Sequence, residues 1–476
     1  MTARPDASPP DASFPDVSPP DVNFAAPTAA TAAATRAALL RDGPILSTLV
    51  RLSLPNLIAL CSATVVSIAE TAYVGTLGVA ALGGVALVFP IFMLMQMLSA
   101  GAMGGTVSGA ISRALGSGDE ARARGLAFAA LAIGLGLGLL LSLTVLAFGP
   151  LIFAAMGGRG TVLAAAIAYA NVAALAITAI WATNMLASVA RGAGNMAVPA
   201  ATILAGGLVQ VAVGGAFGLG LGPFPRLGMA GVALGQVAAF TAAALALFVH
   251  LRAPGARLRL VWTPGALQRR HVADLLRVGA VAMLSPLLSV STILVLTALV
   301  ARFGPEALAG YGIGVRLEFL LIPIAFSVGV ACVPMVGTAI GAGNVARARR
   351  IAWTAGGIAF ATLALLGIIA ALVPGLWVDL FTDEAAVRSA AYAYLGIAGF
   401  SYGFFGLGLC LYFASQGAGR VGGAIAAQAL RLTVVLAGGW YLIEIAAPLW
   451  TIFLLSALAM IPMGLGTALF IKLARW

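Results

Sequence analysis

The sequence predicts an all-α polytopic membrane protein whose twelve transmembrane helices form two pseudo-symmetric bundles of six, related as parallel repeats. Of the 476 residues, 62% are hydrophobic and 9% are charged, which excludes a soluble globular domain of this size. The charged residues divide the chain into twelve apolar segments, each long enough to cross a bilayer. The two halves of the chain also match one another at a constant offset.

The apolar segments follow a polar N-terminal tract. They cover approximately residues 54–77, 79–112, 126–150, 161–190, 196–221, 227–249, 278–301, 307–340, 351–377, 389–415, 421–443 and 447–471. The predicted organisation is a tail (1–44), a first lobe (45–249), a basic linker (250–277), a second lobe (278–471) and a short second tail (472–476). The N-terminal tail repeats PDASP-like units, so we expect it to be disordered, either as a plain tail or as a partner-binding segment.

The basic residues are distributed unevenly between the loops. Nineteen lie on the side of the N-terminus and four on the opposite side, which predicts that both termini are cytoplasmic in a bacterial inner membrane. The net charge of +11 is therefore read as a topology signal, and no nucleic-acid partner is expected. The three cysteines, Cys61, Cys332 and Cys410, show no metal or redox spacing, and we expect neither a metal nor a cofactor.

The internal repeat is clearest just after the second span of each half. ALGSGDEARARGLA (114–127) matches AIGAGNVARARRIA (339–352) at eight of fourteen positions, at an offset of 225. The first spans of the halves align at an offset of 226. Because each half has an even number of spans, both halves enter the membrane in the same sense. Parallel repeats of this kind predict an alternating-access transporter, and one chain with both halves could act as a monomer.

Two of the fifteen acidic residues, Glu70 and Glu318, lie well inside predicted spans. A charge at the centre of a span costs roughly 2.5 to 3.5 kcal/mol to insert, so such an acid faces a cavity or a partner, or carries a proton. Glu70 is the leading candidate for the ion-coupling group, since burial favours the protonated form and permits proton exchange. The alternative is a buried acid with a purely structural role. Neither acid has an acidic counterpart in the repeat.

Glu318 is the second candidate for ion coupling. Arg316 lies two residues away, so the two side chains point to nearly opposite sides of the helix. Arg431, about halfway along the eleventh span, is the expected ion-pair partner of Glu318. A structural pair and a role in transport both remain open for Glu318.

Other residues of the long spans allow two interpretations. Pro90, Pro323 and Pro334 predict either static kinks or gating hinges. Phe92 and Met93 belong to a run of aromatic and methionine residues that either lines an adaptable cavity or packs the bundle.

Four stretches resemble the multidrug and toxic compound extrusion (MATE) family. The first stretch, residues 54–78, contains a proline, a mid-span acid and then YVGTLG. The other three are SRALGSGD in the first half, GPFPRLGMAG between spans five and six, and RLEFLLIPIAFSVGVACVPMVGTAIGAGNVARAR in the second half. The resemblance extends over residues 45–471. It implies a V-shaped pair of six-helix bundles that exports organic compounds, often cationic and amphipathic, by antiport with protons or sodium.

The resemblance also assigns roles by position. Glu70 matches the first-lobe aspartate of the family, and Glu318 with Arg316 matches an Arg-x-Glu pattern of some members. An Asn and an Asp that many members carry in span five are Gln210 and Gly214 here. A threonine often found in span six is Gln236, and spans seven and ten hold no acid of the kind found in sodium-coupled members. Because a hard cation needs several oxygen ligands, this favours protons over sodium.

The sequence thus predicts an antiporter that binds its substrate between the lobes. Further candidates for the substrate cavity are Arg316, Asn184, Gln210, Gln236, Met93 and Phe92. The alternative is a flippase or exporter of a lipid-linked or anionic metabolite, which needs a more cationic cleft. An intramembrane enzyme is not expected, because no span contains a histidine, an HExxH pair or two acids placed for catalysis.

Overall fold

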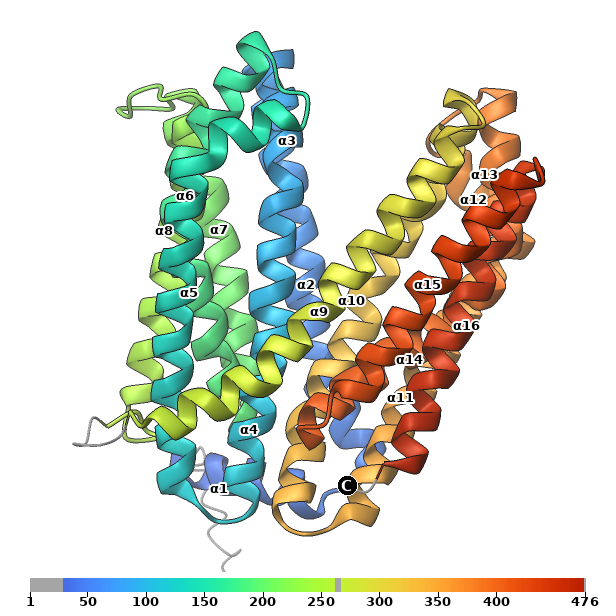
Figure 1. Cartoon of the computed structure of the whole chain (residues 1–476). Coiled ribbons are helices and arrows are strands. Elements are labelled where there is room, and N and C mark those ends of the chain that lie inside the picture. The colour runs from blue at the N-terminus through green and yellow to red at the C-terminus, as the bar shows by residue number, and fades with distance from the viewer. Residues whose placement is uncertain (1–28, 262–266, 475–476) are drawn as a thin grey trace, which may run out of the picture.

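The computed structural model describes residues 29–261 and 267–474. Two groups of long helices touch at one end of the molecule and diverge toward the other (Figure 1). Within the described residues, twelve helices are long and apolar enough to cross a membrane. The predicted fold class is confirmed.

Each predicted apolar segment overlaps one spanning helix or one stack of helical segments. The first lobe contains α2 (Ile45–Thr76), α3 (Val79–Gln96) continued by η1 (Met97–Met103) and α4 (Gly104–Gly116), α5 (Glu120–Ala155), α6 (Gly160–Gly192), α7 (Ala197–Leu219) and α8 (Met229–Arg252). The second lobe contains α9 (Arg269–Ala301), α10 (Pro305–Gly341), α11 (Val345–Leu372), the short α12 (Gly375–Val378), α13 (Ala385–Ala398) continued by η2 (Gly399–Ser401) and α14 (Tyr402–Ala418), α15 (Gly422–Glu444) and α16 (Leu449–Leu473).

The duplicated sequence motif folds into the same turn in both lobes. The Asp119 carboxylate accepts a hydrogen bond from the Arg122 backbone N–H at 2.8 Å, and the Asn344 side chain accepts one from Arg347 N–H at 2.9 Å. These contacts cap the first turns of α5 and α11. Gly118 and Gly343, which precede the two capping residues, have positive φ. Glycine is favoured there because it adopts this left-handed conformation without steric cost. The repeat is therefore structural as well as sequential.

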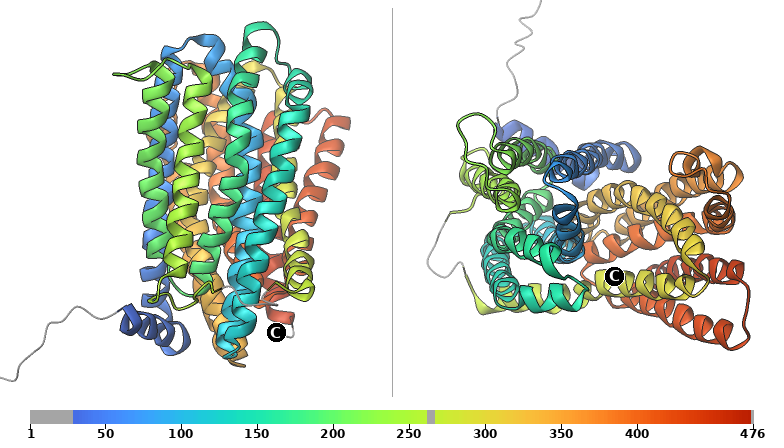
Figure 2. Two further views of the ribbon diagram at one scale, coloured as in Figure 1. Left: turned by 90° about the vertical axis from the view of Figure 1, so that its left-hand side faces the viewer. Right: turned by 90° about the horizontal axis from the view of Figure 1, so that it is seen from above.

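The N-terminal tail and the linker differ from expectation. Residues Ala29–Asp42 form helix α1, so the expected disorder does not extend through this alanine-rich stretch; residues 1–28 lie outside the described residues. The linker is shorter than predicted, because α8 continues to Arg252 and α9 begins at Arg269. Helix α1 lies at the end of the bundle where the lobes meet (Figure 2).

The lobes meet through close backbone contacts between α4 and helices α10 and α14. A methyl group added at Gly341 of α10 would lie 2.1 Å from the Arg113 carbonyl oxygen of α4, so only glycine permits this approach. Arg113 Nη1 donates hydrogen bonds to the carbonyl oxygens of Gln416 (3.1 Å) and Gly417 (2.6 Å). The Gln416 amide in turn donates to carbonyl oxygens of the π-helical segment η1. This end of the molecule is closed.

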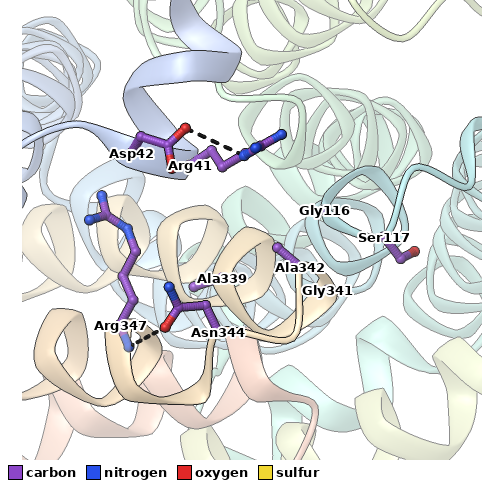
Figure 3. A pocket seen from close by; sticks show the side chains of 9 residues that line it. All are labelled: Arg41, Asp42, Gly116, Ser117, Ala339, Gly341, Ala342, Asn344 and Arg347. Carbon is purple, nitrogen blue, oxygen red and sulfur yellow. Dashed lines mark hydrogen bonds and ion pairs between the residues drawn. The ribbon is translucent and has the colours of Figure 1, made fainter.

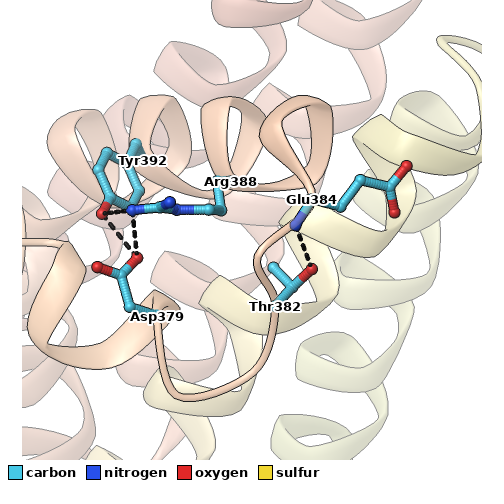
Figure 4. Close-up of polar contacts among 5 residues, drawn as sticks. All are labelled: Asp379, Thr382, Glu384, Arg388 and Tyr392. Carbon is cyan, nitrogen blue, oxygen red and sulfur yellow. Dashed lines mark hydrogen bonds and ion pairs between the residues drawn. The ribbon is translucent and has the colours of Figure 1, made fainter.

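At the opposite end, a polar cluster fixes the connection from α12 to α13 (Figure 4). Arg388 forms an ion pair of 3.0 Å with Asp379, and the Tyr392 hydroxyl donates to the same carboxylate oxygen at 2.8 Å. The Glu384 backbone N–H donates to the Thr382 hydroxyl at 3.1 Å. These bonds lie within the second lobe and hold its own loop.

Candidate functional site

Glu70 lies on α2 with its side chain turned into the first lobe. It is 9% exposed, although most residues around it on α2 face outward. The Tyr169 hydroxyl of α6 donates to Oε1 at 2.9 Å, and the Gln210 amide of α7 donates to Oε2 at 2.8 Å. Both carboxylate oxygens are thus satisfied by neutral donors from two other helices. The ion pairs among the described residues include none with Glu70.

Tyr73, one turn after Glu70, completes this cluster. Its hydroxyl is buried and has no hydrogen-bond partner among the described residues. A methyl group at Gly214 would lie 2.8 Å from that hydroxyl, so the glycine makes room for the tyrosine. Gln210 and Gly214 stand at the two positions where the resemblance implies Asn and Asp. Gln210 is a hydrogen-bond partner of Glu70, and Gly214 leaves room for the Tyr73 ring. Gln236 on α8 is half-buried, and its Oε1 has no partner among the described residues.

Asn184 lies in a second polar cluster where α6 meets η1. Its side-chain amide donates to Gln96 Oε1 at 3.2 Å and to Ser99 Oγ at 2.8 Å. The structure thus places Asn184 in a helix-to-helix contact apart from Glu70.

Phe92 and Met93 of α3 are half-buried, and Phe92 packs against the core of the first lobe.

Glu318 occupies the corresponding interior of the second lobe. Its Oε1 accepts a hydrogen bond from the Tyr394 hydroxyl of α13, and Tyr394 packs edge to face on Tyr311 with ring centroids 5.0 Å apart. Arg316 points elsewhere, as its spacing predicts: it is exposed, with its guanidinium group 5.7 Å from the centre of the Phe381 ring.

The structure places Arg431 and Glu318 in the same lobe without a direct ion pair. None of the ion pairs seen among the described residues joins these two side chains. The buried Arg431 guanidinium lies 5.8 Å over the Phe405 ring and donates to the Met463 sulfur at 3.7 Å. It attracts Glu318 only over a longer distance. A tyrosine hydroxyl donates to the carboxylate instead.

The tyrosines are the site residues that sequence reasoning missed. Tyr169 and Tyr394 are separated by 225 residues, the offset of the repeat. Each donates to the carboxylate inside its own lobe, which is buried in Glu70 and half-buried in Glu318. The offset of the repeat could have pointed to them, because it pairs the two mid-span tyrosines with one another. The two acids, in contrast, have no acidic counterparts in the repeat.

Two parallel six-helix lobes, each with a carboxylate that accepts a hydrogen bond from a tyrosine inside the lobe, define a membrane transporter built from an internal repeat. The chain belongs to the MatE family, whose model matches residues 55–214 and 282–441. The two matches correspond to the two lobes. The protein is therefore a multi-pass membrane transporter and not an enzyme.

Individual relatives agree with this assignment. The probable multidrug resistance protein NorM of Deinococcus radiodurans is 30% identical over 385 residues, which cover 78% of this chain and 80% of the relative. A FAD transporter of Shewanella oneidensis is 25% identical over 324 residues, covering 65% and 69%.

Solved structures share the fold. An outward-facing multidrug resistance transporter of the MATE family superposes with a TM-score of 0.82 at 23% identity, covering 91% of this chain and 96% of that one. A MOP superfamily transporter from Pyrococcus furiosus gives the same TM-score and identity, covering 92% and 98%, and its binding pocket is said to have reverse polarity.

Proposed function

We propose that the protein is a secondary antiporter that exports organic compounds in exchange for protons, with Glu70 as the ion-coupling group. The observation that carries this proposal is the Glu70 carboxyl group, which is buried in the first lobe and accepts hydrogen bonds from Tyr169 and Gln210. The ion pairs among the described residues give it no cationic partner. A carboxyl group in such surroundings can gain or lose one proton with a large change in local energy. Coupling needs a group of this kind.

Protons suit this site better than sodium. A hard cation takes several oxygen ligands, often from more than one carboxylate. Glu70 is the only acidic residue inside a span of the first lobe, and the described residues hold no group of three or more His, Cys, Asp or Glu side chains placed around a common point. Sodium coupling remains the alternative within the same proposal.

Glu318 is proposed as the second coupling residue. It shares with Glu70 the neutral tyrosine donor and the position inside a helical lobe. Arg431 adds a longer-range attraction in the second lobe that Glu70 lacks. We therefore propose that Glu318 tunes the movement of the second lobe.

The distribution of arginines supports an orientation in a bacterial inner membrane. The closed end carries the turns at residues 117–119 and 342–344 and the end of α16, which are flanked by basic residues. By the positive-inside rule this end is cytoplasmic, with both termini on that side. The lobes then diverge toward the outside. One chain holds both lobes, so we propose that a monomer suffices.

The proposed substrates are cationic, amphipathic organic compounds. The NorM relative is named as a probable multidrug resistance protein, and the half-buried Phe92 and Met93 offer adaptable apolar contacts. Candidate cavity residues also include Arg316 and Gln236. The test is uptake of a fluorescent organic cation into proteoliposomes under an imposed pH gradient and then under a sodium gradient. Uptake that follows the pH gradient supports the proposal, and uptake that follows sodium alone contradicts the choice of ion.

A second candidate substrate is an anionic metabolite such as a nucleotide cofactor. The observation that favours it is the similarity to a transporter named for FAD. The same proteoliposomes distinguish the two candidates when loaded with flavin adenine dinucleotide in place of the cation. Transport of the flavin and not of the cation would select this alternative while leaving the architecture unchanged.

A further inference from the structure

The arginines of the duplicated motif form two contacts across the closed end. Arg122, at the start of α5 in the first lobe, pairs with Asp274 of α9 at 3.2 Å. Arg347, at the start of α11 in the second lobe, donates from Nη2 to the carbonyl oxygen of Gly43 at 2.5 Å, just before α2. Each contact joins the third span of one half to the beginning of the first span of the other half. The two contacts are thus related by the repeat.

The two contacts are not chemically equal. At the offset of 226 that aligns the first spans, the carboxylate of Asp274 corresponds to the hydroxyl of Thr48. The Thr48 hydroxyl is buried beside Gly43 and has no hydrogen-bond partner, and Arg347 Nε is likewise buried without one among the described residues. The first contact therefore joins the arginine to a carboxylate, whereas the second joins it to a backbone carbonyl oxygen.

A cavity of about 560 Å³ adjoins this second contact (Figure 3). Its lining comes from α1 (Arg41, Asp42), from the turn after α4 (Gly116, Ser117) and from the end of α10 through Arg347. Arg41 and Arg347 both line this space at the junction of the lobes, and in Figure 3 the Asp42 side chain lies between them. Arg41 pairs with Asp42 at 3.4 Å, but both side chains are more than 70% exposed, so water screens this pair strongly.

We propose that this cavity binds a phosphate-bearing anion through Arg41 and Arg347, and that the anion supplies the negative charge that Asp274 supplies to the first contact. Phosphate matches the planar guanidinium group because it accepts paired, charge-assisted hydrogen bonds. The bound anion joins α1 to the second lobe and stabilises the closed end. The source is either the headgroup of an anionic lipid or free phosphate, since the cavity opens at the end assigned to the cytoplasmic surface.

The test measures binding to the purified full-length protein, so it does not depend on transport. Thermal unfolding and native mass spectrometry are recorded with dioleoyl phosphatidylglycerol, with dioleoyl phosphatidylcholine and with inorganic phosphate. We expect phosphatidylglycerol to bind more tightly than phosphatidylcholine. Arg41→Gln and Arg347→Gln should each weaken its binding roughly tenfold, as expected for the loss of a charged hydrogen-bonding group. If inorganic phosphate binds with the same dependence on the two arginines, the source is free phosphate.

Two further variants separate this site from general effects of charge or folding. Arg350→Gln removes an exposed arginine of the same helix that does not line the cavity, and it should bind as wild type does. Asp42→Asn removes the competing carboxylate and should strengthen binding. Equal binding by wild type, Arg41→Gln and Arg347→Gln would overturn the proposal, as would an equal loss in Arg350→Gln.

Discussion

Tyr169 and Tyr394 occupy equivalent positions of the internal repeat, and each donates a hydrogen bond to the carboxylate inside its own lobe. The acids are not equivalent. Glu70 lies on the first span of its half, whereas Glu318 lies on the second span of its half. The two lobes therefore build related carboxyl–tyrosine pairs with acids from different helices. If the proposed role of these acids holds, both lobes carry a carboxyl group with a tyrosine donor, and the two can be tested in parallel.

The first prediction concerns the tyrosine donors. A hydrogen bond donated to a carboxylate favours its ionised form, so Tyr169→Phe should let Glu70 keep its proton to a higher pH. We expect the pH of half-maximal transport to rise by about half to one unit, equivalent to one ordinary hydrogen bond. Tyr394→Phe tests the second lobe in the same way. A fall in the midpoint, or an identical profile in both variants and wild type, would contradict the assignment.

The second prediction concerns the helix contact that supports Gln210. A methyl group at Gly235 of α8 would lie 2.5 Å from the Gln210 carbonyl oxygen and 2.8 Å from Gly214 Cα. Backbone atoms cannot move aside easily, so Gly235→Ala should destabilise the protein by about 1 to 3 kcal/mol and weaken proton coupling.

Thermal unfolding in detergent measures the first effect. The matched control is Gly136→Ala on α5, where an added methyl group meets nothing within 4 Å. This control should be neutral or slightly stabilising, since alanine favours the helix. Equal destabilisation by the two variants would show that the close contact at Gly235 has no special role.

The third prediction concerns the closed end. A Cβ atom at Gly337 of α10 would lie 3.0 Å from Ser112 Cβ of α4. This is closer than the roughly 3.5 to 4.5 Å found in disulfides, so a cross-link here requires α4 and α10 to move slightly apart. Alternating access requires the lobes to separate here, so oxidation of a Ser112→Cys, Gly337→Cys double variant should abolish transport and reduction should restore it.

The cross-link is best examined without Cys61, because Cys332 and Cys410 are buried. The control is the Ser112→Cys single variant, which leaves Gly337 in place and should transport under both conditions. A fully cross-linked double variant that still transports would rule out separation of the lobes at α4 and α10.

Long-range features of the fold were predictable from the sequence because they depend on hydropathy and duplication. Twelve spans, two lobes and the mid-span position of Glu70 and Glu318 all follow from these patterns. Helix α1 was missed because the proline-rich tract before it dominated the composition of the tail. The alanine-rich residues 29–42 were the local signal.

The partners of the acids were harder to predict because they lie on other helices. Hydropathy places Arg431 at the right depth to meet Glu318, but not on the right side of its helix, and Tyr394 takes the position expected for it. Gln210 was assigned to the substrate cavity, whereas its amide is bonded to Glu70. Rotation of one helix about its axis decides such contacts, and an apolar sequence specifies this rotation weakly.

The most direct test of the account measures proton release when substrate binds. Purified protein in weakly buffered detergent solution is mixed with a fluorescent organic cation, and the pH change is compared between wild type, Glu70→Gln and the exposed-site control Glu306→Gln. We predict that wild type and the control release protons on binding and that the folded Glu70→Gln variant does so far less. Release by Glu70→Gln equal to that of wild type would show that Glu70 does not exchange the coupling proton.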